Sequence, residues 1–66
     1  MSKRTLAQSV EIVYESHAPF MVEMILTDDG WNGCRSKDIF NAMKRGEYEI
    51  AGEILKDNGW KAEMVY

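Results

Sequence analysis

The chain has 66 residues, a formal net charge of −3 and 45% hydrophobic residues. This composition excludes a disordered chain, and the length predicts one small domain, residues 1–66. A domain of about 60 residues buries only about 60% of the surface that its unfolded chain exposes. The single cysteine, Cys34, excludes an internal disulfide, and with the single histidine it does not make a zinc ligand set. We therefore expect no metal and no cofactor.

The sequence shows no targeting signal. The opening MSKRTLAQSVEIV has basic residues but no uninterrupted apolar run and no cleavage site. No window approaches the roughly 18 apolar residues that a membrane span needs. A lone cysteine points to a reducing compartment. The sequence predicts a cytoplasmic protein that does not contact a membrane.

The first 27 residues predict a β-hairpin. Residues 1–7 are expected to be a flexible arm, and apolar and polar residues then alternate along 8–15 and again along 20–27. Pro19 lies in the connection, where it would end the first strand. The alternating apolar positions are Val10, Ile12, Tyr14, Phe20, Val22, Met24 and Leu26.

The same segment also permits two helices. Leu6, Val10, Val13 and His17 fall at helical spacing. Pro19 would suit the first position of a second helix. One side of that helix would then carry Phe20, Met21, Met24 and Ile25.

Residues 36–58 predict a helical hairpin. Ser36 is an expected N-cap, and Gly46 supplies a left-handed residue that ends the first helix. A second helix follows and ends before Gly59. Its predicted apolar stripe is Ile50, Ala51, Ile54 and Leu55.

The C-terminal segment favours the β-hairpin over the two helices for the first 27 residues. Apolar residues alternate along 60–66, and a lone strand would need a partner for its backbone groups. A hairpin would provide that partner. We therefore predict an α+β domain, β-β-α-α-β, with a three-stranded antiparallel sheet and the helical pair on one face. An all-α bundle is the alternative.

One short motif occurs twice. ILTDDGW at 25–31 resembles ILKDNGW at 54–60, and the similarity does not continue beyond these seven positions. The echo is compatible with a duplicated unit, but acidic or amide residues before glycine end many elements, so we interpret it as shared turn chemistry.

Catalysis is not expected. Cys34 and His17 are the only pair that resembles a nucleophile and a base, and both lie in predicted loops. No other acid, base or metal set converges, and the sequence therefore does not predict an enzyme.

The loop around Trp31 predicts a protein-binding site. Trp31 lies between acidic residues and glycines, so we expect it to be accessible, and an accessible tryptophan is a frequent interface hot spot. The alternative is that Trp31 covers the end of the small core. Tyr14, Phe20, Phe40 and Trp60 fit the core pattern instead. The predicted binding set also contains acidic and amide residues of the loop and of the second predicted helix of the hairpin: Asp28, Asp29, Asn32, Glu49 and Glu53.

A basic stripe on the first helix of the hairpin predicts a different function. Its residues fall on one side of that helix and could contact phosphates or a base edge. The alternative function is a small nucleic-acid-binding regulator, although the net charge of −3 disfavours it. The stripe consists of Arg35, Lys37, Asn41, Lys44 and Arg45.

The sequence thus favours a small protein-binding module. We expect an inhibitor or adaptor that covers a surface of a host or cellular protein, as small accessory proteins of phages and mobile elements do. A homodimer is compatible with the exposed edge of a small sheet.

Overall fold

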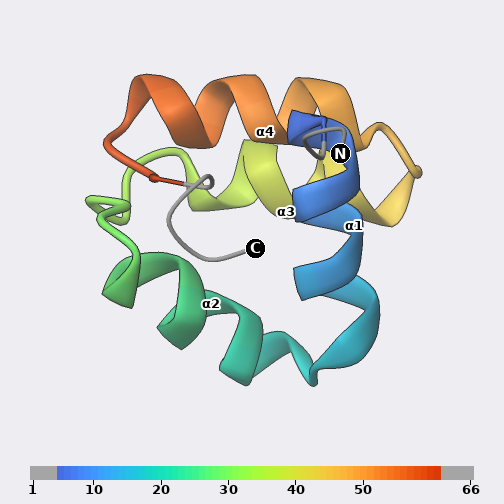
Figure 1. Ribbon diagram of the computed structural model, residues 1–66, viewed down its shortest axis with the longest axis horizontal. Coiled ribbons are helices and arrows are strands. Elements are labelled where there is room, and N and C mark those ends of the chain that lie inside the picture. Colours follow the sequence, from blue (N-terminus) through green and yellow to red (C-terminus); the bar gives the residue numbers. More distant parts are fainter. Residues whose placement is uncertain (1–4, 62–66) are drawn as a thin grey trace, which may run out of the picture.

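The computed structural model describes residues 5–61, and these form four helices (Figure 1). The helices are α1 (Leu6–Ser16), α2 (Pro19–Asp28), α3 (Ser36–Lys44) and α4 (Tyr48–Asp57). They hold 70% of the described residues, and that part of the chain has no strand. The predicted three-stranded sheet and α+β class are therefore wrong, and the all-helical alternative is confirmed.

Helix α1 begins with a capping box, which explains why the segment is not a strand. Thr5 Oγ1 accepts a hydrogen bond from Gln8 N at 3.1 Å, and Thr5 N donates to Gln8 Oε1 at 2.8 Å. Two backbone donors at the helix end are satisfied in this way. Val10 and Val13 then face the core at helical spacing.

Helix α2 begins at Pro19, which the fixed φ of proline suits. Ala18 before it is extended, as a residue preceding proline prefers. The buried side of α2 carries Val22 and Leu26, whereas the side chains of Phe20 and Met24 are 69% and 57% exposed. The apolar residues that alternate along 20–27 therefore do not share one face, because two of them lie on the buried side of the helix and two on the exposed side.

Helices α3 and α4 form the expected pair, with one difference at the start of α3. Arg35, with a left-handed φ of 61°, occupies the N-cap position, and Ser36 is the first helical residue. The helix ends at Lys44, and Gly46 follows the C-cap residue Arg45 with a φ of 77°. Glu47 N donates to Ala42 O at 2.9 Å, which satisfies one carbonyl of the last turn.

The predicted arm and the predicted C-terminal strand both lie only partly within the described residues. Of the predicted arm 1–7, Leu6 and Ala7 belong to α1, and residues 1–4 lie outside the described part. Of the predicted strand 60–66, Trp60 and Lys61 are not in a strand, and residues 62–66 lie outside the described part.

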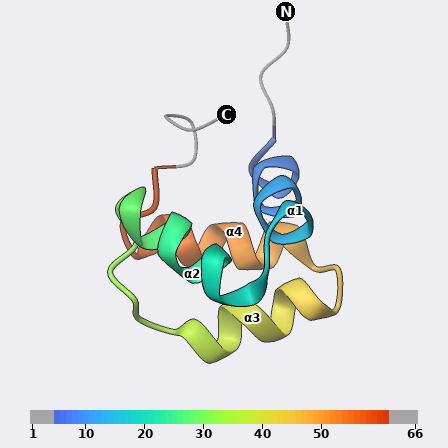
Figure 2. The same cartoon turned by 90° about the horizontal axis from the view of Figure 1, so that it is seen from below.

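Helix α4 is central to the packing. It lies against α1 and α3, whereas α2 lies on the opposite side of the molecule from α4 and contacts mainly α1 (Figures 1 and 2). The core is one apolar cluster to which all four helices and both tryptophans contribute. Its buried members are Val10, Val13, Val22, Leu26, Trp31, Ile39, Ala42, Met43, Ala51, Leu55 and Trp60.

The repeated heptapeptide forms two equivalent turns that pair with each other. Trp31 N donates to Leu26 O at 3.1 Å, and Trp60 N donates to Leu55 O at 3.0 Å. Each turn is a Schellman-type stop with a glycine at positive φ. Across the pair, Asn32 N donates to Asn58 O at 3.0 Å and Lys61 N donates to Asp29 O at 2.9 Å. Asn32 and Lys61 are equivalent positions in the two turns, as are Asp29 and Asn58. Exchanging the two turns therefore converts one hydrogen bond into the other, so the pair has a local two-fold arrangement.

The equivalence extends into the helices. Helices α2 and α4 start 29 positions apart, at Pro19 and Tyr48, and end 29 positions apart, at Asp28 and Asp57. Buried positions match at the same offset; for example, Val10 and Ile39 are both 0% exposed, as are Val22 and Ala51. The interpretation of the echo as turn chemistry alone is therefore wrong, because the fold contains two related helix-turn-helix units.

Candidate functional site

A groove of about 460 Å³ lies between α2 and α3. The wall from α3 consists of residues spaced i, i+3, i+4 and i+7, which is one stripe of a helix. The wall from α2 contains Pro19, Phe20 and Glu23, and Ser36 closes one end. The α3 stripe is Lys37, Phe40, Asn41 and Lys44.

A second hollow, of about 270 Å³, continues along α2. Glu23 lines both hollows, and Met24 and Thr27 extend the α2 wall. Phe20, Glu23, Met24 and Thr27 again follow i, i+3, i+4 and i+7 spacing, so the two hollows share one continuous helix stripe. We call the two hollows together the α2–α3 groove.

The α2–α3 groove is the open counterpart of a closed contact between α1 and α4. A Cβ atom at Gly52 of α4 would lie 2.6 Å from Leu6 Cγ and 3.2 Å from Val10 Cγ2 of α1. Only glycine allows α4 to lie this close to α1. The position 29 residues earlier is Glu23, whose larger side chain lines the groove. The two helix pairs therefore pack differently on related scaffolds.

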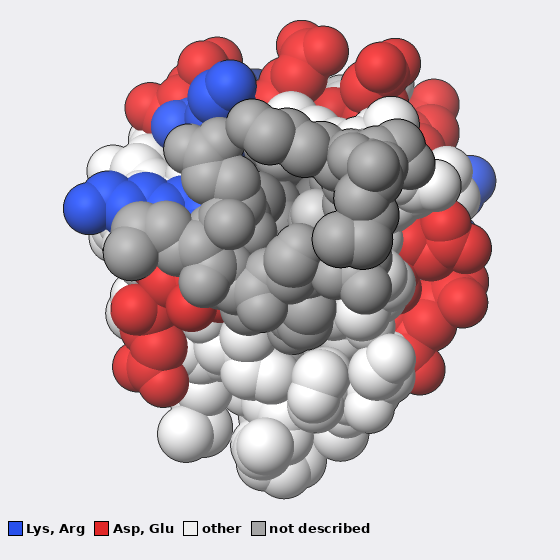
Figure 3. Space-filling model, viewed as in Figure 1, with Lys and Arg blue, Asp and Glu red and all other residues white. Residues whose placement is uncertain are grey.

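The residue types also differ between the two faces. The α2–α3 face carries Phe20, Met24, Phe40 and Lys44, and the positions related to them by the 29-residue offset on α1 and α4 carry four exposed glutamates. Figure 3 shows acidic side chains along the margins where α4 and α1 lie and at the end of α2, and uncharged surface over the rest of α2. The glutamates are Glu49, Glu53, Glu11 and Glu15, in the same order.

The exposed apolar side chains of α2 form the second feature of this face. Phe20, Met21 and Met24 are 69%, 37% and 57% exposed. Exposed apolar side chains that are scattered singly are normal, but a contiguous group marks an interaction surface. Ile50 on α4 is the other large hydrophobic residue of this kind in residues 5–61, at 52% exposed, and it stands apart from the groove.

Two of the four cations in the basic stripe predicted from the sequence form ion pairs, and two do not. Arg35 Nε lies 3.2 Å from Asp38 Oδ2, and Arg45 Nη1 lies 3.9 Å from Glu47 Oε1. Lys37 and Lys44 make no ion pair with the described residues. Both line the groove, together with Asn41. Two cations that have no ion-pair partner in residues 5–61 thus lie on the α3 wall of the groove, beside Phe20 and Phe40.

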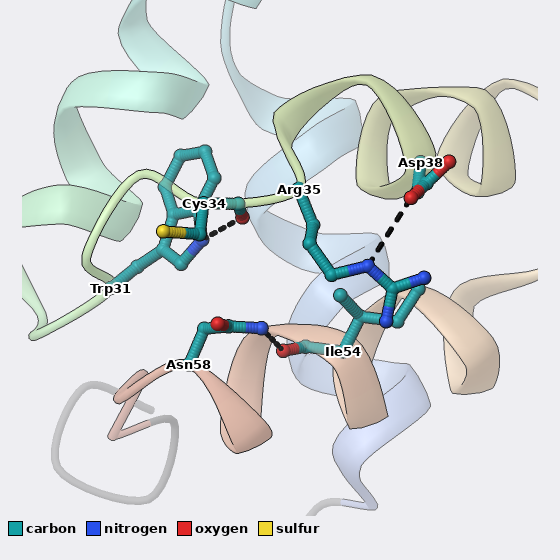
Figure 4. A network of polar contacts seen from close by, with 6 residues as sticks. All are labelled: Trp31, Cys34, Arg35, Asp38, Ile54 and Asn58. Atoms are coloured by element: carbon teal, nitrogen blue, oxygen red, sulfur yellow. Dashed lines mark hydrogen bonds and ion pairs between the residues drawn. The ribbon is translucent and has the colours of Figure 1, made fainter.

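The expectation of an accessible Trp31 is wrong. Its side chain is 2% exposed, and its Nε1 donates to Cys34 O at 3.0 Å (Figure 4). Asn32 Oδ1 accepts from Cys34 N at 2.9 Å and holds the same loop. Phe20, expected in the core, is exposed instead. Trp31 therefore serves as a core residue whose edge lines the second hollow.

The other residues of the predicted protein-binding set are dispersed. Asp28 is exposed and lines the second hollow beside Trp31. Asp29 is half-buried in the paired turns, and its Oδ2 accepts no hydrogen bond from the described residues. Glu49 and Glu53 are exposed on α4, away from the groove.

The predicted binding set did not contain three apolar residues of the groove lining, which are Phe20, Met24 and Phe40. A signal was present for Phe20 and Met24, because a helix beginning at Pro19 cannot bury both these residues and Val22 and Leu26 on one side. This signal is informative only if the segment that begins at Pro19 is interpreted as a helix and not as a strand. Phe40 is only half-buried, at the edge of the core.

One titratable group in residues 5–61 has a clearly shifted pKa. The clear pKa shift is that of Tyr48, whose pKa is raised chiefly because its hydroxyl donates a hydrogen bond to Glu15 Oε2, at 3.0 Å. Glu15 lies on α1 and Tyr48 on α4, and neither lines the groove. His17 Nδ1 lies 3.1 Å from Val13 O, and Cys34 is an exposed free thiol. In residues 5–61 no three His, Cys, Asp or Glu side chains gather as a metal site.

Each helix in the described part of the chain is too short or too polar to span a membrane. Comparisons with protein-family models, curated proteins and solved structures find no match. The geometry of the α2–α3 groove therefore carries the functional argument.

Proposed function

We propose that this protein is a small protein-binding module that acts by covering a surface of a partner protein, as an inhibitor or adaptor does, and that it works in the cytoplasm. One observation carries the proposal: the α2–α3 face exposes Phe20, Met21 and Met24 beside a groove, whereas the related α1–α4 face is acidic. Side chains that stay exposed add little to the stability of a small domain, so the position of these three apolar side chains on one helix favours a binding role.

The binding site differs from the one expected from the sequence. Phe20 and Met24 replace Trp31 as the apolar anchors, because Trp31 is buried. Asp28 keeps a place at the end of the groove. Catalysis plays no part in the proposal, since a binding module needs only a complementary surface.

Affinity capture from a lysate of the source cells tests the proposal. Tagged protein is compared with the double variant Phe20→Ser/Met24→Ser and with the control Ile50→Ser, which removes an exposed apolar side chain from α4. We expect a stoichiometric protein partner that survives nuclease treatment. The double variant should lose at least about tenfold in affinity, because anchor residues at interfaces contribute about 1–2 kcal/mol or more each.

The two variants also separate binding from folding. All three substituted side chains are exposed, so each variant should keep the unfolding free energy within about 0.5 kcal/mol. Equal capture by the wild-type protein and the Phe20→Ser/Met24→Ser variant would contradict the site.

Nucleic-acid binding is the second candidate function. It is supported by Lys37, Asn41 and Lys44, which line one groove with two phenylalanines that could stack on bases. Capture that disappears with nuclease and falls steeply between two salt concentrations would favour this candidate, because phosphate contacts release counterions.

A further inference from the structure

The walls of the groove indicate the shape of its occupant. The α3 stripe of i, i+3, i+4 and i+7 residues lines the first hollow, whereas the α2 stripe of the same spacing runs through both hollows, and each stripe extends about 10.5 Å along its axis. The space between two such stripes is where a third helix packs, with its apolar ridge between theirs. No described residue belongs to a strand, so the described surface has no sheet edge to which an extended peptide could add.

The charges of the groove indicate the chemistry of its occupant. Lys37 and Lys44 are two helical turns apart on α3 and make no ion pair within the described chain. Glu23 lies on the α2 wall. A complementary helix has acidic residues on the edge that faces α3 and a neutral or basic residue on the edge that faces α2.

From these observations we infer that the α2–α3 groove binds an amphipathic helix of a partner protein, with apolar residues at i, i+3, i+4 and i+7 and acidic residues along the α3 edge. This inference rests on the proposed function and specifies its partner. The apolar ridge contacts Phe20, Met24 and Phe40. The acidic edge contacts Lys37 and Lys44.

A peptide-display selection provides the first test. The library consists of random peptides of about 16 residues, which suffice for four helical turns. Selection uses the wild-type protein, with counter-selection against the Phe20→Ser/Met24→Ser variant. We expect enriched sequences that share the apolar spacing and carry acidic residues on one flank. Enriched sequences without helical spacing or acidic residues, or no enrichment at all, would overturn the inference.

A charge exchange provides the second test. Binding of an enriched peptide is measured by fluorescence anisotropy with wild-type protein, Lys37→Glu/Lys44→Glu, and the control Lys56→Glu/Lys61→Glu, which changes the net charge equally. We expect the first double variant to bind at least about tenfold more weakly and the control to bind within about twofold. A peptide with its acidic residues replaced by lysine should bind the Lys37→Glu/Lys44→Glu variant better than it binds the wild-type protein.

Three further outcomes would each overturn the inference. One is equal peptide binding by the wild type and Lys37→Glu/Lys44→Glu. The second is tight, salt-sensitive binding of a single-stranded DNA oligonucleotide that depends on the same two lysines. The third is a dimer in sedimentation equilibrium that Phe20→Ser/Met24→Ser dissociates. If lysate capture still requires Phe20 and Met24 while the peptide tests fail, the proposed function stands and only the helical, acidic partner is refuted.

Discussion

Asp29 and Asn58 occupy the same position in the two paired turns but differ in hydrogen bonding. Asn58 Nδ2 donates to Ile54 O, four residues earlier, at 2.7 Å (Figure 4). The equivalent carbonyl for Asp29 is that of Ile25, to which a carboxylate cannot donate. Asp29 Oδ2 is buried and has no hydrogen-bond partner in residues 5–61. The first turn thus contains a polar group that the second turn satisfies.

We expect Asp29→Asn to stabilise the fold. The amide would donate to Ile25 O, and an unsatisfied buried carboxyl oxygen would be removed, for a gain of about 1 kcal/mol. For a domain of this size, that corresponds to a rise of about 4–8 °C in Tm, which thermal unfolding followed by circular dichroism measures. The reverse change, Asn58→Asp, should lower Tm. A lower Tm for Asp29→Asn would refute this interpretation of the turn.

At the scale of helices, Gly52 allows α1 and α4 to pack closely, whereas a groove remains between α2 and α3. The α1–α4 contact requires a position without a side chain, since even a Cβ would lie 2.6 Å from Leu6 Cγ. Glycine inside a helix costs roughly 1 kcal/mol in propensity, so close packing has to compensate for it. Helix α2 has Glu23 at the related position, and the groove beside α3 remains open.

The Gly52→Glu variant, which copies the residue of α2 into α4, should separate α1 from α4. Overpacking and burial of a charged side chain should lower the unfolding free energy by at least about 2 kcal/mol. Urea unfolding measures the loss. The neighbouring exposed variant Glu53→Gln should stay within about 0.5 kcal/mol of wild type. Equal urea midpoints for Gly52→Glu and the wild type would show that the contact is looser than described.

At the scale of the whole molecule, the paired turns join the two helix-turn-helix units. A Cβ at Gly30 would lie 2.5 Å from Gly59 O, and a Cβ at Gly59 would lie 2.5 Å from Gly30 O. Both residues also have positive φ, of 110° and 100°. These two glycines allow the backbones of the units to touch.

We expect Gly30→Ala and Gly59→Ala to destabilise the protein more than an alanine at another glycine of positive φ. Gly33→Ala and Gly46→Ala are matched controls, because nothing lies within 4 Å of a Cβ at either position. The controls should lose about 1–2 kcal/mol through backbone strain alone. Each variant in the paired turns should lose more, because its Cβ also meets a carbonyl oxygen. Similar urea midpoints for all four variants would contradict the close approach.

The features that depend on local interactions could be predicted from the amino-acid sequence. The segment 36–58 predicts two helices because Gly46, Gly59 and the apolar spacing act within a few residues. The cations of the groove, Lys37 and Lys44, were also identifiable from their helical spacing. The repeated heptapeptide was visible in the sequence as well, although not its pairing.

The remaining features depend on contacts between residues that are distant in the sequence. The alternation of 20–27 and its helical spacing are both compatible with local geometry, and packing against α1 selects the helix. Burial depends on contacts between distant residues, so the pattern around Trp31 and Phe20 could not show that Trp31 enters the core and Phe20 remains exposed. The pairing of turns 29 residues apart places Trp31 inside, and the side chain at Glu23 in place of glycine leaves the α2–α3 groove open.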